Sequence, residues 1–393
     1  MTSSMSSRLA QRIRELPPYL FARIDELKQA QLARGADLID LGIGDPDLPT
    51  PPHVVAELQR AALEGRHHRY PSYQGMAELR RAAAAYYKSR WDVTLDPARE
   101  VVALIGSKEG IAHFPLAFVD PGDLVLVPDP SYPVYAVATR FAGGRVHSLP
   151  LQRLNGFLPD LEAIPVEVAR EAKIIWINYP NNPTAATAPL SFYEELVAWA
   201  REYDVIVASD NAYADVYFDE ESRPPSVLSV AGASDVAIEF YSLSKTYNMT
   251  GWRVAFACGN PDLVGGLGKV KTNVDSGVFE AVQRAAITAL TGDQTCVADM
   301  REVYRQRREV LCGGLTAAGF DVLTPRASFF AMIANPPGYS SMEFAARLLE
   351  EAHIVVTPTT GFGAAGEGFV RLTLCAPAER LAEAVQRMTK LPL

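Results

Sequence analysis

The sequence predicts an α/β protein in which a mostly parallel central sheet is sandwiched between helices, with a smaller α+β domain beside it. From about residue 100 onward, short apolar runs rich in Val and Ile alternate with stretches whose apolar residues recur at helical spacing. A repeated strand–helix–strand order is typical of parallel sheets that are covered by helices on both faces. The length of 393 residues also allows one large domain and a smaller one.

Apolar runs in this region are expected to form the buried strands of the sheet, because each is short, continuous and rich in β-branched residues. Residues 191–203, between two of these runs, have the apolar spacing of a helix. In chain order the expected strands span residues 101–106, 123–128, 173–178, 204–209, 237–244 and 253–259.

The two ends of the chain follow a different pattern. The N-terminal segment indicates a helix, a break at a Pro-Pro pair and a second, amphipathic helix. The C-terminal third carries a long helical stretch at 296–319 and a strand at 369–374. We therefore predict a large domain at residues 48–285, and a small domain assembled from residues 1–47 and 286–393.

Composition and charge argue against several classes of protein. The formal net charge is −9 and the isoelectric point is near 5.3, so nucleic acids and anionic membranes would not be attracted. The four cysteines form no CxxC pair, which gives no zinc signature and fits reduced thiols in the cytoplasm. No run has the length of a membrane span or of a secretory signal. We expect a cytoplasmic protein without metal, nucleic-acid or membrane partners.

Lys245 lies just past an expected strand, among hydroxyl-bearing residues, in the stretch SLSKTYNMTGWR. Ser242, Ser244 and Arg253 could donate directional hydrogen bonds to a phosphate dianion. A lysine amine beside such a site can form a Schiff base with an aldehyde. An aldehyde that also carries a phosphate and a basic ring nitrogen is pyridoxal 5′-phosphate, whose ring nitrogen needs an acidic partner. Asp210, which follows the expected strand 204–209, is the candidate for that partner.

Two further polar signals follow expected strands. Gly106, Ser107 and Lys108 stand between a strand and a helix, where free backbone N–H groups suit a phosphate, although an ordinary helix N-cap has the same pattern. Asn182 and Pro183 belong to an Asn-Asn-Pro-Thr turn, which also fits a plain turn. In doubly wound sheets ligands bind at the carboxyl ends of strands, so these signals are expected to converge.

The same residues partly match the motifs of a family of serine hydrolases. Ser242 to Lys245 satisfies the S-x-x-K pattern of penicillin-binding enzymes, and S-D-N occurs at residues 209–211. In that family the Ser-Lys pair precedes S-D-N, whereas here it follows, and the nearest approach to K-T-G is Lys271-Thr272-Asn273. The order and the missing motif argue against this function.

The combination of Asp210-x-x-Tyr213, Ser-x-Ser-Lys245, Arg253 and Asn-Asn-Pro-Thr on this scaffold resembles the class I/II aminotransferases with the aspartate aminotransferase fold. The resemblance covers nearly the whole chain. It implies that Lys245 forms the Schiff base and moves the proton between substrate and cofactor. It also implies that Asp210 pairs with the pyridine nitrogen, and that Tyr213 completes the catalytic set. The implied cofactor is pyridoxal 5′-phosphate.

The resemblance implies further contacts in the same site. Besides Lys245 and Asp210, the expected cofactor-binding residues are phosphate ligands, a stacking ring, two groups at the phenolic oxygen and a tyrosine from a partner subunit: Ser107, Lys108, Ser242, Ser244, Arg253, Tyr132, Asn182, Tyr213 and Tyr70. The expected substrate contacts are Tyr19, Gly44, Tyr132, Asn182 and Arg371, the last of which would hold the α-carboxylate. The implied assembly is a homodimer whose active sites are shared between subunits.

Within this family the sequence is most similar to the LL-diaminopimelate aminotransferases. The stretches ELPPYLFARIDEL, IDLGIGDPDLPTP, IGSKEGIAHFPLAF and SLSKTYNMTGWR carry this similarity, and Tyr19 in the first of them would face substrate. Ser276 stands where one branch has Asn, so its contact with the partner's site is left open. The implied reaction transfers an amino group between glutamate/2-oxoglutarate and LL-2,6-diaminopimelate/tetrahydrodipicolinate, in lysine biosynthesis.

Other interpretations fit the same residues. The site would also serve an aminotransferase for aspartate, alanine or aromatic amino acids, or a pyridoxal-dependent carbon–sulfur lyase. A regulator built on this fold would need an appended DNA-binding module, and we expect none in this chain. Tyr19, Tyr70 and Tyr132 also fit ordinary buried aromatic residues, and Arg371 also fits a structural ion pair.

Overall fold

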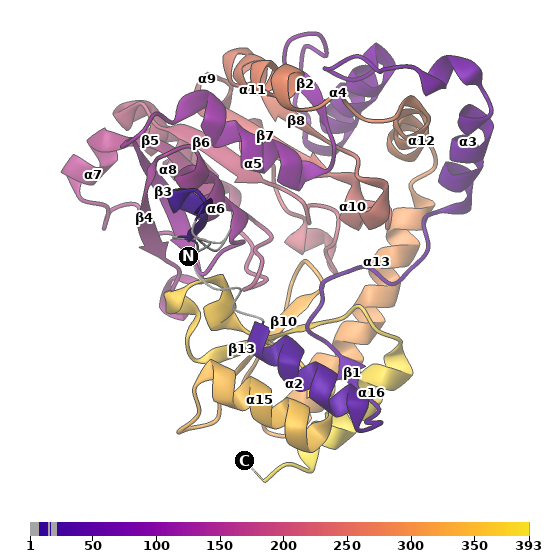
Figure 1. The fold of residues 1–393 in the computed structure, drawn as a ribbon, viewed down its shortest axis with the longest axis vertical. Helices are drawn as coiled ribbons and strands as arrows, with labels where there is room; N and C mark the ends of the chain where they lie inside the picture. Colours follow the sequence, from indigo (N-terminus) through magenta and orange to yellow (C-terminus); the bar gives the residue numbers. More distant parts are fainter. Residues whose placement is uncertain (1–7, 15, 17–21, 393) are drawn as a thin grey trace, which may run out of the picture.

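A seven-stranded sheet forms the centre of the computed structural model, which describes residues 8–14, 16 and 22–392 (Figure 1). Its strand order is β2-β8-β7-β6-β5-β3-β4. The pairs from β4 to β7 are parallel, and the two pairs that involve β8 are antiparallel. The strands are β2 (Val101–Leu104), β3 (Leu124–Asp129), β4 (Arg145–Pro150), β5 (Ala172–Ile177), β6 (Ile206–Asp210), β7 (Ala237–Ser242) and β8 (Ala255–Gly259).

Helices cover both faces of this sheet, which confirms the predicted α/β class. Side chains of α5 (Ser107–Phe118), α6 (Val134–Phe141) and α11 (Pro261–Val274) form one buried apolar cluster with the strands. Side chains of α7 (Val166–Glu171) and α8 (Leu190–Tyr203) form a second cluster with them. Strands that are buried on both faces need continuous apolar runs, and this is the pattern that identified most of them in the sequence.

The N-terminal residues join the C-terminal third of the chain. Strand β1 (Ile39–Asp40) pairs in parallel with β11 (Ile354–Val355). Helix α2 (Ala22–Ala33) lies beside α15 (Ser341–Ala352) at the bottom of Figure 1. A four-stranded antiparallel sheet in the order β12-β13-β10-β9 belongs to the same region. Its strands are β9 (Val322–Leu323), β10 (Phe330–Ala334), β12 (Thr357–Pro358) and β13 (Phe369–Thr373).

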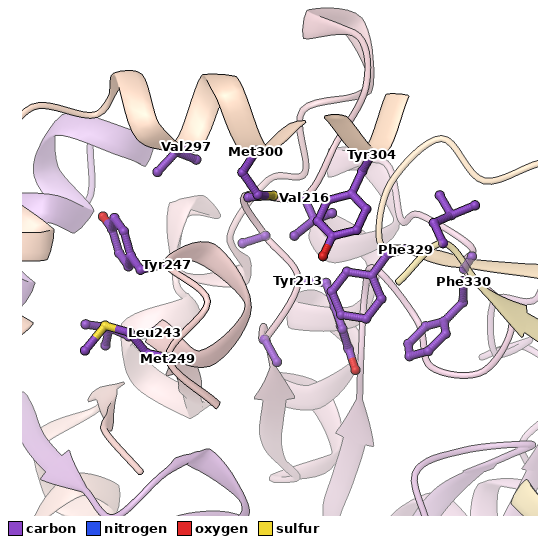
Figure 2. Packing of buried hydrophobic residues seen from close by; sticks show 14 of the residues in the cluster. Tyr213, Val216, Leu243, Tyr247, Met249, Val297, Met300, Tyr304, Phe329 and Phe330 are labelled. Carbon is purple, nitrogen blue, oxygen red and sulfur yellow. The ribbon is translucent and has the colours of Figure 1, made fainter. Parts of the chain in front are cut away.

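Helix α13 (Thr295–Arg308) runs between the two sheets (Figure 1). Figure 2 shows Tyr304 projecting from this helix toward Phe329 and Tyr213, and Met300 projecting toward Val216, within a cluster of buried apolar side chains. The long helical stretch expected at 296–319 is therefore present, with a π-helical segment at Glu309–Gly313 before α14 (Gly314–Ala317). The domain boundaries themselves stay a prediction.

Seven further α-helices lie in the described residues. They are α1 (Gln11–Arg14), α3 (Pro52–Ala62), α4 (Ala77–Trp91), α9 (Ala233–Val236), α10 (Leu243–Thr246), α12 (Glu280–Thr291) and α16 (Ala378–Thr389). Over the part of the chain that is described, no helix has both the length and the apolar character that a bilayer crossing requires.

Candidate active site

A cavity of about 780 Å³ opens at the carboxyl ends of the parallel strands and is closed from the other side by residues of the smaller sheet. It lies where doubly wound sheets hold their ligands. Most of the residues singled out in the sequence line it. They are Gly44, Ser107, Lys108, Tyr132, Asn182, Asp210, Tyr213, Ser242, Ser244, Lys245, Arg253 and Arg371.

Lys245 projects into this cavity from α10, a single helical turn that directly follows β7. The Ser242 hydroxyl caps the turn by accepting a hydrogen bond from the Ser244 backbone N–H at 3.2 Å. The Lys245 amine donates to the Gly44 carbonyl at 3.0 Å. Burial lowers the pKa of Lys245, opposed by Cys375 and Asp45. The site thus favours a neutral amine, which is the form that acts as a nucleophile or a base.

Asp210 ends strand β6 and is buried, 5% exposed. Its Oδ2 accepts a hydrogen bond from the Tyr135 hydroxyl at 2.7 Å, while its Oδ1 is buried with no hydrogen-bond partner among the described residues. Burial raises the pKa of Asp210 to about 6, against the lowering effect of the Tyr135 hydrogen bond. The Ala212 backbone N–H also favours the charged carboxylate. A buried carboxylate oxygen without a hydrogen-bond partner is costly, so a donor or cation from a ligand at Oδ1 would stabilise the site.

Backbone and hydroxyl donors gather at one end of the cavity. Helix α5 begins at Ser107, and its N-cap residue Gly106 has φ +76°. A Cβ at Gly106 would lie 2.1 Å from Nη2 of Arg253, so only glycine lets the guanidinium reach this position. The hydroxyls of Ser242 and Ser244 line the same cavity. The N-terminus of α5, the two serine hydroxyls and the Arg253 guanidinium together suit a dianion such as phosphate.

Asn182 and Tyr132 occupy other walls of the cavity. The Asn182 backbone N–H donates to Oδ1 of Asn178 at 2.8 Å, and Nδ2 of Asn178 donates to the Asp210 carbonyl at 2.7 Å. Asn178 thereby fixes the turn that carries Asn182 against the end of β6. The Tyr132 ring packs edge-on against Tyr135, with centroids 6.0 Å apart, and the Lys108 amine lies 5.6 Å from the Tyr132 ring centroid.

Arg371 projects from β13 and is 6% exposed. Its Nη1 donates to Oδ1 of Asn182 at 2.6 Å and its Nη2 to the Gly42 carbonyl at 2.6 Å, while its Nε is buried and meets no hydrogen-bond partner in the described part of the chain. The rings of Phe330 and Phe362 lie 4.2 and 4.7 Å from the guanidinium carbon. Burial lowers the pKa of Arg371 to about 10. The guanidinium is therefore a desolvated cation that no described carboxylate neutralises, so the structural ion pair considered above is wrong.

Two other residues named from the sequence, Tyr70 and Ser276, do not line this cavity. Tyr70 is 89% exposed and does not line the cavity in this single chain, so its interpretation as a buried aromatic residue is wrong. Ser276 is also exposed. Tyr19 lies outside the described residues.

Sequence reasoning missed several residues that shape the site. Tyr135 binds Asp210, Asn178 fixes the Asn182 turn, and Phe330 and Phe362 cover Arg371. A signal existed for Tyr135, which lies three positions after Tyr132, and for Asn178, which ends the expected strand 173–178. The two phenylalanines lie in the C-terminal third, where no sequence pattern connects them to the cavity.

Comparisons with known proteins agree with this geometry. Residues 36–388 match the family model described as aminotransferase class I and II. The chain is 56% identical to an LL-diaminopimelate aminotransferase of Syntrophobacter fumaroxidans, over 97% of this chain and 98% of that one. A substrate-bound BacF structure from Bacillus subtilis superposes with a TM-score of 0.93, at 35% identity over 97% of both chains. A mutant aspartate aminotransferase from Thermus thermophilus does so with a TM-score of 0.91, at 30% identity over 97% of this chain and 99% of that one. This chain therefore belongs to the class I and II aminotransferase family.

Proposed function

We propose that this protein is a pyridoxal 5′-phosphate-dependent aminotransferase that acts on LL-2,6-diaminopimelate. It would move an amino group between glutamate/2-oxoglutarate and the diaminopimelate/tetrahydrodipicolinate pair, in lysine biosynthesis. The observation that carries the proposal is one cavity holding the Lys245 amine, the unpartnered Oδ1 of Asp210 and the unneutralised Arg371. The choice of substrate rests on the 56% identity to a protein of that name.

The residues of the cavity fit pyridoxal 5′-phosphate. The free Oδ1 of Asp210 would accept from the protonated ring nitrogen, and the Tyr132 ring would lie against the pyridine. The phosphate end would be held by Ser107, Ser242, Ser244 and Arg253. Lys108, whose amine lies near the Tyr132 ring, would contribute to the same end. Asn182 and Tyr213 are proposed to contact the phenolic oxygen. When bound, the cofactor supplies an electron-poor ring that takes up the negative charge left at the substrate Cα.

The chain's own groups would perform the proton transfer. Burial lowers the pKa of the Lys245 amine and so favours its neutral form, which can take the proton from the substrate Cα in one half-reaction and return a proton to Cα in the reverse one. The Gly44 carbonyl holds this amine at the cavity wall when it is free. The Tyr135 hydrogen bond favours the charged form of Asp210 against the opposing effect of burial, and Arg371 would hold the substrate α-carboxylate in a fork geometry.

We also propose a homodimer in which Tyr70 reaches the partner's cavity. Tyr70, Tyr73 and Phe279 are large apolar side chains that remain exposed in the single chain, 89%, 48% and 44% respectively. Their segments adjoin each other, because a Cβ at Gly277 would lie 3.1 Å from the Ser72 carbonyl oxygen. Clustered exposed aromatic residues are typical of protein interfaces. The free thiols of all four cysteines favour a cytoplasmic location.

The substrate is tested by a donor panel. Cofactor-loaded protein is mixed with LL-diaminopimelate, L-aspartate, L-alanine or L-phenylalanine together with 2-oxoglutarate, and glutamate formation is measured. We expect the highest kcat/KM with LL-diaminopimelate. A higher value with another donor would replace the proposed substrate. Release of a thiol or sulfide from a sulfur amino acid, without glutamate formation, would instead identify a lyase.

A further inference from the structure

A loop of the smaller sheet docks onto the carboxyl end of β3. This docking loop, residues 359–366, consists of two 3₁₀ turns, Thr359–Phe362 and Ala364–Gly366, and leads into β13. Oδ1 of Asp129 accepts a hydrogen bond from the Ala365 backbone N–H at 3.1 Å. The Ser131 backbone N–H donates to the Phe362 carbonyl at 2.8 Å. Two hydrogen bonds thus join the end of a central strand to a segment from the other sheet.

The docking loop places an aromatic ring at the cation of the site. Phe362 is 9% exposed, and its ring centroid lies 4.7 Å from the guanidinium carbon of Arg371. An aromatic ring at this distance attracts the cation and keeps water from it. Electrostatic attraction between a guanidinium and an incoming carboxylate is stronger where water is excluded. The position of Phe362 therefore affects how tightly Arg371 can bind a carboxylate.

The contact depends on glycine at position 363. Gly363 has φ +144°, and a Cβ built there would lie 1.9 Å from Oδ1 of Asp129. Any side chain at this position would push the carboxylate away from the Ala365 N–H. Gly368 provides a matched comparison, because it also has a positive φ, +100°, but a Cβ there meets no atom within 4 Å.

We propose that Asp129 is a positioning residue for substrate binding, which acts by holding the docking loop so that Phe362 covers Arg371. Asp129 is not one of the described residues that line the cavity, so it acts through the loop and not by contact with substrate. The inference rests on the proposed role of Arg371 as the ligand of the substrate carboxylate. In this proposal the affinity for a carboxylate depends on the contact between Asp129 and the docking loop, which joins the two sheets.

The test uses cofactor-loaded protein and four variants: D129A, D129N, G363A and G368A. Affinity for a carboxylate is measured without chemistry, by calorimetric titration with succinate, and KM is measured for L-glutamate and 2-oxoglutarate. We expect D129A and G363A to weaken succinate binding and raise both KM values about fivefold to tenfold, the range that one cation–π contact supports. D129N should restore most of the affinity, because its amide oxygen can still accept from Ala365. G368A should match the native protein, because it also places an alanine at a positive φ but brings its Cβ against no atom within 4 Å.

The direction in which D129A changes the succinate affinity distinguishes a positioning role of Asp129 from simple charge repulsion. A carboxylate that acted only by repelling anionic substrates would give tighter succinate binding when removed, which would overturn the proposal. In the D129A background, G363A should cost little further affinity, because the colliding atom is gone. Native affinity in both D129A and G363A would also overturn it.

A fifth variant, R371Q, separates this inference from the proposed function. Weak succinate binding in R371Q with native binding in D129A would refute only the docking-loop contact. Native binding in R371Q would refute the carboxylate role of Arg371, and the inference with it. The cofactor absorption band and the urea midpoint of each variant check that the fold and the cofactor site are retained.

Discussion

Asp210 illustrates how one residue links the fold to the proposed chemistry. The end of β6 places its carboxylate in the cavity, where one oxygen accepts a hydrogen bond from Tyr135 and the other has no hydrogen-bond partner among the residues that the structure describes. Such an arrangement is unfavourable in the empty protein, because burial opposes the charge. It becomes favourable when a cationic ring nitrogen is present, so cofactor binding should relieve a cost that the fold imposes.

This cost predicts a pH effect on the cofactor-free protein. Burial raises the pKa of Asp210 to about 6 from the ordinary aspartate value of 3.8, so between these two values the folded state binds more protons than the unfolded state. Stability must then fall as pH rises from about 4 to about 6, by up to about 3 kcal/mol from this group. Asp210→Asn removes the charge, so it should stabilise the cofactor-free protein more at pH 7 than at pH 4.5. Urea unfolding of both proteins at both pH values measures this, and an equal effect at the two pH values would contradict it.

At the residue scale the sequence allowed the candidate cofactor-site residues of the cavity to be predicted, but not most of the other residues that line it. Lys245, Asp210 and Asn182 each follow a strand, and the edge where parallel strands end brings them together. Arg371 and Gly44 came from the family resemblance, and they do line the cavity. Phe330 and Phe362 could not be predicted, because they reach Arg371 through antiparallel pairing and loop docking that no local pattern encodes.

At the scale of elements, α10 is the most demanding piece of the site. A four-residue helix has almost no stability of its own, so its position depends on what holds it. The Thr246 hydroxyl donates to Oδ2 of Asp215 at 3.3 Å, and the Tyr241 hydroxyl donates to the same oxygen at 2.5 Å. Asp215 is 2% exposed and lies in the segment after β6, so it connects the segment of Asp210 to the helix of Lys245.

Removing the Asp215 carboxylate should strongly lower the unfolding free energy of the protein. Nε of Arg90 donates to Oδ1 of Asp215 at 2.7 Å, so Asp215→Ala leaves a largely buried cation unpaired. We expect a loss of about 3–5 kcal/mol in unfolding free energy. Asp235→Ala, which removes an exposed partner of Arg201 at 3.2 Å, should cost less than about 1 kcal/mol. Urea unfolding of the two variants makes the comparison, and a similar loss in both would refute the anchoring role of Asp215.

In the seven-stranded sheet, strands that are buried on both faces were predicted from their apolar runs, whereas β1, β9, β10, β11 and β12 of the smaller sheets were not predicted. All the apolar runs expected to be strands are strands, with ends shifted by about two residues. Strand β4 was missed because it is an edge strand whose residues, such as Arg145 and His147, are partly exposed and polar. The run 237–244 was expected to be strand throughout, but the structure ends β7 at Ser242 and begins α10 at Leu243. The Ser242 cap explains this end, because it favours a helical turn over further pairing.

At the scale of the whole molecule, the proposed dimer completes the site. Tyr70 is the one cofactor contact expected from the sequence that the single described chain leaves outside its cavity. A tyrosine that serves the partner's site must be exposed when the subunits are apart. The pairing of β1 with β11 joins an N-terminal segment to the C-terminal third of the chain, as the proposed small domain requires.

Subunit mixing tests the shared site. Lys245→Ala and Tyr70→Ala proteins are each expected to have little activity. When they are unfolded together and refolded, mixed dimers should contain one site with both native residues, which restores about a quarter of the native activity. No recovery in dimers that sedimentation shows to have mixed would place Tyr70 in its own subunit's site, and a monomer with full activity would refute the dimer.

The proposed dimer also explains why the sequence could indicate Tyr70 but not place it. Its role came from a family resemblance, and an interface between copies leaves only exposed aromatic residues in one chain. To predict which surfaces of the two subunits pack against each other would require the structure of both copies of the chain.

The most direct test of the proposed chemistry is a half-reaction followed by absorbance. Cofactor-loaded protein is mixed with LL-diaminopimelate in the absence of any oxo acid, and 2-oxoglutarate is added afterwards. We expect the visible band of the bound cofactor to disappear and then to return, with neither change in Lys245→Ala and both in Lys269→Ala, an exposed lysine of α11. Band loss and recovery at the native rate in Lys245→Ala, or no response of the native protein to any amino acid, would contradict the assignment of Lys245.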